Sequence, residues 1–506
     1  MNACLEQGGF ANRAAVVGGL ERVMTRPKVP NRLLRGLLAE AGWTEDFLAR
    51  QINAVAAESG VAMRLDRRSV THWLAGRRPR SPVPELIAEA FSRGLHRPVD
   101  ASDTGLGTPA AGGEPQPGRG SRAGAGRSAL ADGESSALPQ DVTSVLAGLA
   151  QFDEGRRRML SATAYRLAAL AVPGWVQAAA REPGLVPWPD ASCAQRLEPG
   201  QVATVEQMTR VFSDTDDSFG GGHARAELSC YLAFDIAPRL RAAGTPALRS
   251  RLFSATTQLT YLAAFMCFDD ECHGLAQHYY RAALKLAAEN SDPAGYAVTL
   301  RGMSVQARRL GHLQYAVDLA ETAATISRSA ADPARQAFFL GQVAVAAAAA
   351  GNRRHALTTI SAAERRLDRA CSPASADPKV QGGPAMGRYH PGALAHQQAA
   401  VRALMGDRRG AITTLTEAIR LRPPWERRSR ALIHARLAEL HLDQGQLEQA
   451  VTFWHAFLDD YPFLTCRRAT AAVKVLRSRL HPQRVNPAVR QLLARTTTWT
   501  LDTAAS

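Results

Sequence analysis

The sequence predicts an all-α protein in three parts: a small helical bundle, a flexible linker and a long helical solenoid. Apolar residues recur with helical spacing from Val142 nearly to Thr497, and no sustained alternating run indicates a strand. A motif with a period close to 40 residues recurs in this region, as is typical of solenoids. With 506 residues the chain is also long for a single core.

The formal net charge is +15, and nearly all of the positive charge is arginine, because the only lysines are Lys28, Lys285, Lys379 and Lys474. The planar fork of arginine suits phosphates and guanine edges. However, an arginine- and alanine-rich composition is equally expected of a GC-rich genome. Net charge alone therefore supports nucleic-acid binding only weakly, and the position of the charge matters more.

Four short helices are predicted between Asn31 and Gly94. Each begins or ends at a residue type that suits a helix terminus. These residues are Gly42 after the first helix, Thr44 before the second, Asp66 and Gly76 around the third, and Pro84 and Gly94 around the fourth.

The third of these helices indicates the function. At about 100° per residue, Val70, Trp73 and Leu74 face the core, whereas Arg68 and His72 face outward. A short, polar face rich in donors is what a helix in a major groove requires, and arginines just after the helix can follow a phosphate backbone. The predicted site for double-stranded DNA is Arg67, Arg68, Ser69, Thr71, His72, Arg77, Arg78 and Arg80. The competing interpretation is a solvated arginine face on a small bundle.

The long C-terminal region contains a repeat marked by alanine. Ala276, Ala316, Ala356, Ala411 and Ala450 are equivalent, at spacings of 40, 40, 55 and 39 residues. A glycine lies five residues before each of the last four, at 311, 351, 406 and 445, and the long spacing holds a loop-like insertion at 371–390. We interpret each unit as a helix, a glycine turn and a second helix with a small residue at the crossing.

Two units resemble the tetratricopeptide repeat, with a period longer than its usual ~34 residues. In the last unit the matching residues are Ala438, Gly445, Ala450, Trp454, Phe457 and Pro462, and in the preceding one they are Ala399, Gly406, Ala411, Leu415, Ala418 and Pro423. Small residues let two helices approach closely, and the large one fills the groove that remains. Residues 141–260 are helical but less regular, and we expect them to form the irregular start of the same superhelix.

The N-terminal bundle resembles the Xre or lambda-repressor type of helix-turn-helix. The resemblance is carried by Trp43, Thr44, Leu48, Ala49, Arg50, Ser69, Val70, Trp73, Leu74, Gly76, Arg78, Pro79 and the segment 84–90. The chain departs from the family at the connection 56–66, which is longer than the usual turn and either lengthens the second helix or forms a small wing.

The expected organisation is a disordered N-terminus at 1–28, a helix-turn-helix domain at 29–100, a disordered linker at 101–140, the repeat domain at 141–480 and a tail at 481–506. The linker is expected because residues 103–140 are rich in glycine, proline and serine and cannot bury enough surface to fold. This whole arrangement resembles the actinobacterial regulators with an Xre-type head and a tetratricopeptide body. Some of these are negative regulators of sporulation and antibiotic production.

Other candidate sites are weaker. Cys267, Cys272 and His273 lie close together but inside an apolar helical stretch, so no metal site is predicted. The segment 213–225 partly matches a calcium loop, but Phe219 and Arg225 stand where glycine and glutamate are required. Gly220–Gly222 could cradle an anion, although a connection between helices is the favoured interpretation. No catalytic motif, cofactor motif or membrane span is evident, and scattered cysteines fit a reducing compartment.

The resemblance implies a cytoplasmic, non-enzymatic, sequence-specific DNA-binding transcription regulator, which we expect to repress differentiation or secondary metabolism. Its repeat domain is expected to bind a peptide, protein or small-molecule effector, or to form a homodimer. The alternative is a tetratricopeptide scaffold or adaptor whose head does not bind DNA. The operator, the effector, the direction of regulation, the oligomeric state and the choice between Met1 and Met24 as the start stay open.

Overall fold

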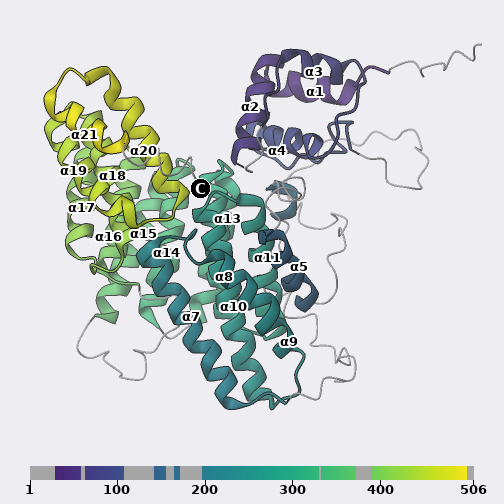
Figure 1. The fold of residues 1–506 in the computed structure, drawn as a ribbon, viewed down its shortest axis with the longest axis vertical. Helices are drawn as coiled ribbons and strands as arrows, with labels where there is room; N and C mark the ends of the chain where they lie inside the picture. The colour runs from purple at the N-terminus through teal and green to yellow at the C-terminus, as the bar shows by residue number, and fades with distance from the viewer. Residues whose placement is uncertain are drawn as a thin grey trace, which may run out of the picture.

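The computed structural model describes residues 29–58, 63–107, 142–154, 165–170, 196–329, 332–371 and 389–497. The predicted N-terminal segment 1–28, most of the predicted linker and most of the insertion at 371–390 lie outside these ranges. The described elements are helices, apart from one isolated bridge between Arg196 and Ala243. The prediction of an all-α fold with an N-terminal bundle and a tetratricopeptide-like solenoid is therefore confirmed (Figure 1).

The head consists of α1 (Arg32–Ala41), α2 (Glu45–Glu58), α3 (Arg67–Leu74) and α4 (Val83–Leu95) around one apolar core. Its predicted helix ends are mostly confirmed. Gly42 ends α1 with φ 65°, the Thr44 hydroxyl accepts a hydrogen bond from the N–H of Phe47 at 3.2 Å, and the Asp66 carboxylate accepts one from the N–H of Ser69 at 2.9 Å. These caps satisfy backbone groups that would otherwise lack partners.

The prediction that Gly94 ends the fourth helix is wrong. α4 continues to Leu95 and ends at His96, which has φ 53°. A Cβ atom on residue 94 would lie 2.1 Å from Cζ2 of Trp43, so no larger residue fits beneath this ring. Glycine serves here for close packing and not for a turn.

The head extends past the predicted boundary at residue 100. Leu106 is buried in its core, and the side-chain amide of Asn31 donates a hydrogen bond to the carbonyl of Thr104 at 2.8 Å. The sequence left open whether the connection 56–66 lengthens the second helix or forms a small wing. In the structure, α2 extends into this connection as far as Glu58. The side chain of Asn53 then holds both backbone groups of Leu65, at 2.8 and 2.9 Å.

The body is a series of antiparallel helix pairs. They are α10 (Pro246–Asp269) with α11 (His273–Glu289), α12 (Pro293–Arg309) with α13 (Leu313–Ile326), α14 (Pro333–Ala349) with α15 (Arg353–Ala370), α16 (Pro391–Leu404) with α17 (Arg408–Arg420), α18 (Arg427–Asp443) with α19 (Leu447–Asp460), and α20 (Arg467–Leu480) with α21 (Pro487–Thr497). Short 3-10 turns, η3 (Ser327–Ser329), η5 (Tyr461–Phe463) and η6 (His481–Gln483), follow α13, α19 and α20.

The five marker alanines occupy one equivalent place in the body. Each is the fourth residue of the second helix of its pair, in α11, α13, α15, α17 and α19, and each has no exposed surface. Four of the preceding turns use a glycine with φ between 72° and 88°, at 311, 351, 406 and 445. In the first pair Glu271 takes this place with φ 56°, a conformation that glycine adopts far more easily.

Less regular helices precede the pairs, as expected. They are α5 (Val142–Glu154), η1 (Leu167–Leu170), α7 (Pro199–Phe219), α8 (Arg225–Cys230), the π-helical turn η2 (Tyr231–Ile236) and α9 (Ala237–Leu240). At the other end, Val489 and Leu492 of α21 are fully buried against the last pairs. The packed body therefore continues to Thr497, past the predicted boundary at residue 480.

The superhelix turns back on itself, so that its last pairs contact its first helices. Thr465 exchanges backbone hydrogen bonds with Phe219 (2.7 Å) and Gly222 (2.9 Å) in the connection after α7. The buried guanidinium of Arg428 lies 2.9 Å from Asp216 and 3.6 Å from Asp269. The two ends of the repeat series are thus held together by these backbone and charged contacts, which we call the closing contact.

We expect Gly351→Ala to lower the free energy of unfolding by about 1–2 kcal/mol, because alanine is strained at positive φ. A Cβ on this residue would meet no other atom within 4 Å, so the cost comes from the backbone alone. The matched control is Gly351→Asn, since asparagine tolerates this conformation better. Thermal unfolding should rank wild type above Asn above Ala, and equal midpoints would contradict this account of the turn.

Candidate nucleic-acid interface

The outward face of α3 is free of contacts with the core. Val70, Trp73 and Leu74 are buried, whereas Arg68 and His72 are exposed. The helix begins at Asp66, whose pKa is lowered by hydrogen bonds from the backbone and the hydroxyl of Ser69 and, to a smaller extent, by the charge of Arg68. The sequence therefore predicted both faces of α3 correctly.

The remaining predicted site residues divide into two groups. Thr71 donates a hydrogen bond to the Glu45 carboxylate at 2.6 Å, Arg67 lies 3.6 Å from the same carboxylate, and the Ser69 hydroxyl donates to Asp66 at 2.8 Å. By contrast, Arg77, Arg78 and Arg80 are exposed on the segment after α3. The first group is held in place by acidic neighbours, and the second is available to a partner.

Several exposed arginines in the described part of the head have no ion pair, and five of them lie on α3 or on the segments beside it. Among the described residues, eight exposed arginines of the head form no ion pair: Arg32, Arg35, Arg50, Arg64, Arg68, Arg77, Arg78 and Arg80. Four of the five glutamates of the head, at 40, 58, 85 and 89, pair instead with Arg93, Arg97 and Arg166. These four glutamates are thus neutralised around α4. The unpaired arginines lie on α1, α2, α3 and the segments beside α3, as do the acids Glu45, Asp46 and Asp66.

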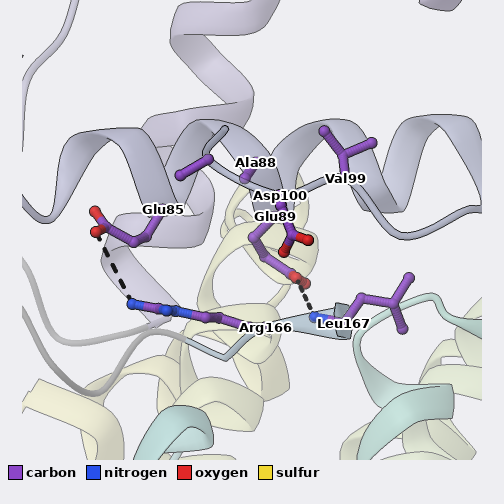
Figure 2. A pocket seen from close by; sticks show the side chains of 8 residues that line it. Glu85, Ala88, Glu89, Val99, Asp100, Arg166 and Leu167 are labelled. Atoms are coloured by element: carbon purple, nitrogen blue, oxygen red, sulfur yellow. Dashed lines mark hydrogen bonds and ion pairs between the residues drawn. The ribbon is translucent and has the colours of Figure 1, made fainter. Parts of the chain in front are cut away.

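The head contacts the body through α4. Glu89, fully buried, accepts hydrogen bonds from the backbone N–H of Leu167 at 3.2 Å and from Arg93 at 2.8 Å, and it lies 2.8 Å from Nε2 of His312 in the turn before α13. One turn earlier, Glu85 lies 3.9 Å from Arg166. Figure 2 shows Glu85 and Glu89 pointing from α4 towards the segment that holds Arg166 and Leu167.

The segment around Arg166 is held from the other side as well. The side chain of Gln277 in α11 bonds both backbone groups of Arg166, at 3.0 and 2.9 Å, and the ring of Tyr165 stacks on His312. A cavity of about 30 Å³ beside Glu85 and Glu89 has room for little more than a water molecule. This junction is therefore a packed contact and not a ligand pocket.

Sequence reasoning missed this junction. Glu89 and His312 are 223 residues apart, and no local motif indicates that they are partners. A charged residue on the apolar face of the fourth predicted helix was the one available signal, since buried glutamate is rare unless it is paired. In Figure 1, α4 is the head helix nearest the body, and α1 and α3 lie on the side away from it.

The weaker candidates have structural roles. Cys267 is buried in the core and His273 is buried at the start of α11, and no cluster in the described ranges has three or more side chains placed to bind a metal ion. The apparent calcium-loop residues Asp214, Asp216 and Ser218 lie inside α7. None of the helices described here is both long enough and apolar enough to cross a membrane.

Comparison with known proteins gives a match for the head. Residues 34–107 match the family model described as the SP15 N-terminal domain, which includes the stretch after residue 100 that packs on the head. No curated protein matches the chain. Among solved structures, the APC/C hetero-tetramer Cut9–Hcn1 is similar with 15% identity and a TM-score of 0.30, over 54% of this chain and 46% of the matched chain. At this level of similarity the match implies nothing about a ligand or partner.

We expect Glu89→Ala to loosen the head–body junction, because it leaves the N–H of Leu167 and the ring of His312 without their buried partner. Losing a buried hydrogen bond to a charged group costs about 1.5–3 kcal/mol, so hydrogen exchange in residues 165–170 should speed up about tenfold or more. The control is Glu85→Ala, which removes the longer and more exposed pair with Arg166 and should change little. Equal acceleration by both variants would show that Glu89 has no special role.

Proposed function

We propose that this protein is a sequence-specific DNA-binding regulator whose head binds duplex DNA through α3 and whose repeat body binds an effector or partner. The observation that carries the proposal is the exposed face of α3 set among eight arginines that have no ion pair in the described parts of the head. Unpaired cations on one surface favour a polyanion. Four of the five described glutamates of the head are paired near α4, and the fifth, Glu45, is held by Arg67 and Thr71.

The geometry suggests a division of labour within this surface. Arg68 and His72 project from α3 and would contact base edges, where a bidentate arginine prefers guanine. Arg77, Arg78 and Arg80 follow the helix and would contact phosphates, which position a protein on DNA without reading its sequence. Because the body contacts the head through α4, it leaves α3 accessible to a duplex.

The body accounts for the second half of the proposal. Tetratricopeptide-like solenoids present long curved surfaces suited to binding partners. The resemblance to actinobacterial regulators leads us to propose repression as the outcome of DNA binding, with the body acting as a sensor. A scaffold is the second candidate, because the repeat fold serves protein binding equally well without a DNA-binding head.

The test is DNA selection with the full-length protein, followed by affinity measurements on the selected site and on a scrambled duplex. We expect Arg68→Ala to weaken binding to the selected site by about 1–3 kcal/mol and to reduce the preference over the scrambled duplex. Arg78→Ala should weaken binding to both duplexes alike. It should also reduce the slope of log affinity against log salt concentration by about one.

The matched control is Arg354→Ala, which removes an exposed arginine of the body and should leave binding unchanged. If Arg68→Ala weakens both duplexes equally, α3 is not the base-contacting helix. If no duplex is selected and wild type binds the scrambled DNA as weakly as the variants do, the scaffold is favoured over the regulator.

A further inference from the structure

Two arginines of α12 have no acidic partner in the described parts of the chain. Arg301 and Arg308 are seven residues apart, so they lie on the same face of the helix. Neither forms an ion pair there, whereas the adjacent Arg309 pairs with Glu271 at 3.4 Å. Both guanidinium groups are partly covered by the protein, and an unpaired buried charge is costly.

These arginines face a surface shared by the first helices of several pairs. The guanidinium of Arg301 lies 3.7 Å from the ring centre of Phe338 in α14, and this ring packs edge-on against Tyr389 just before α16. His396 lies on α16, the helix that begins just after Tyr389, and its Nδ1 is shielded from solvent. Burial and then the charges of Arg422, Arg308 and Arg468 lower its pKa to about 3. We call Arg301, Arg308 and His396 the inner basic cluster.

Each member of the inner basic cluster has a buried nitrogen that lacks a partner. Nε of Arg301, Nε of Arg308 and Nδ1 of His396 are shielded from solvent and form no hydrogen bond in the structure. Buried polar groups are nearly always hydrogen-bonded in folded proteins. Three such nitrogens on the first helices of two pairs, α12 and α16, indicate that this region lacks hydrogen-bond acceptors.

Among the described residues, the carboxylates that pair with the arginines of this region are already in use. Asp269 already pairs with Arg468 and Arg428, Asp216 pairs with Arg428, and Glu426 pairs with Arg422. Each of these carboxylates therefore serves an arginine of the closing contact or Arg422, which lies between α17 and α18. The described residues thus supply no carboxylate for these three nitrogens, and a bound ligand would satisfy them.

We propose that the inner basic cluster binds a small molecule bearing an oxyanion, a phosphate or a carboxylate, on the inner surface of the repeat body. Arginine forks match the oxygens of both groups, and a neutral imidazole adds one further hydrogen bond. The site lies on the body, so this proposal does not depend on DNA binding by the head.

The test is thermal unfolding of the full-length protein in rising sodium phosphate and, separately, sodium succinate, each against sodium chloride of equal ionic strength. Binding to the folded state raises the midpoint saturably, and we expect a rise of about 2 °C with at least one of the two anions. A preference for one salt identifies the ligand as a phosphate or as a carboxylate.

Arg308→Met should abolish the rise and, without an added anion, should unfold at the wild-type temperature or above it, because it removes an unpaired buried charge. Arg309→Met, its exposed neighbour, and Arg78→Met on the head should both retain the rise. Arg301→Met provides a second test of the cluster and should also abolish the rise.

Three outcomes would overturn the proposal. One is the absence of a saturable rise with either anion. Another is a rise that survives both Arg308→Met and Arg301→Met but disappears in Arg78→Met, which would assign the anion to the head. The third is a loss of stability in Arg308→Met without added anion, which would assign this arginine a structural role.

Discussion

The close crossing of two helices within each pair is the constraint on which the body depends. At each crossing a fully buried alanine leaves space for one methyl group, at positions 276, 316, 356, 411 and 450. A larger side chain would push the helices apart. Because the turn before the second helix also has a positive φ in each of these five pairs, each of them leaves its turn in a similar direction. Repetition of this geometry curves the array until its last pairs meet α7 and α10.

The closing contact is made of charges that balance one another at some cost. Burial and then neighbouring acids raise the pKa of Asp216 against the effect of Arg428, whereas Arg468 and Arg428 outweigh burial and lower the pKa of Asp269. Buried pairs of this kind stabilise a structure little in net terms, but breaking one leaves an uncompensated charge. The closing contact therefore contributes little net stability, and its main effect is to specify which helices meet. Its arginines also pair with Asp216 and Asp269, so these acids are not available to the inner basic cluster.

Local patterns in the sequence predicted local features well. The caps at Thr44 and Asp66, the two faces of α3 and the alanine repeat depend on residues within a few positions of one another, and the structure has all of them. Features that depend on distant partners could not be predicted. Gly94 was assigned to a turn because the ring of Trp43, which lies over it, comes from the distant connection between α1 and α2. The pairing of Glu89 with His312 and the acidic partners of Arg428 are likewise visible only in three dimensions.

The closure of the repeat array has a consequence for biosynthesis. Asp216 and Arg428 are 212 residues apart, so the ribosome must finish most of the chain before they can meet. An open array can fold one unit at a time as it emerges from the ribosome. Here, Asp216 has no buried arginine partner until the fifth pair, which contains Arg428, has been made. Contacts this distant slow folding, and truncation near the C-terminus should therefore damage the beginning of the body as well as its end.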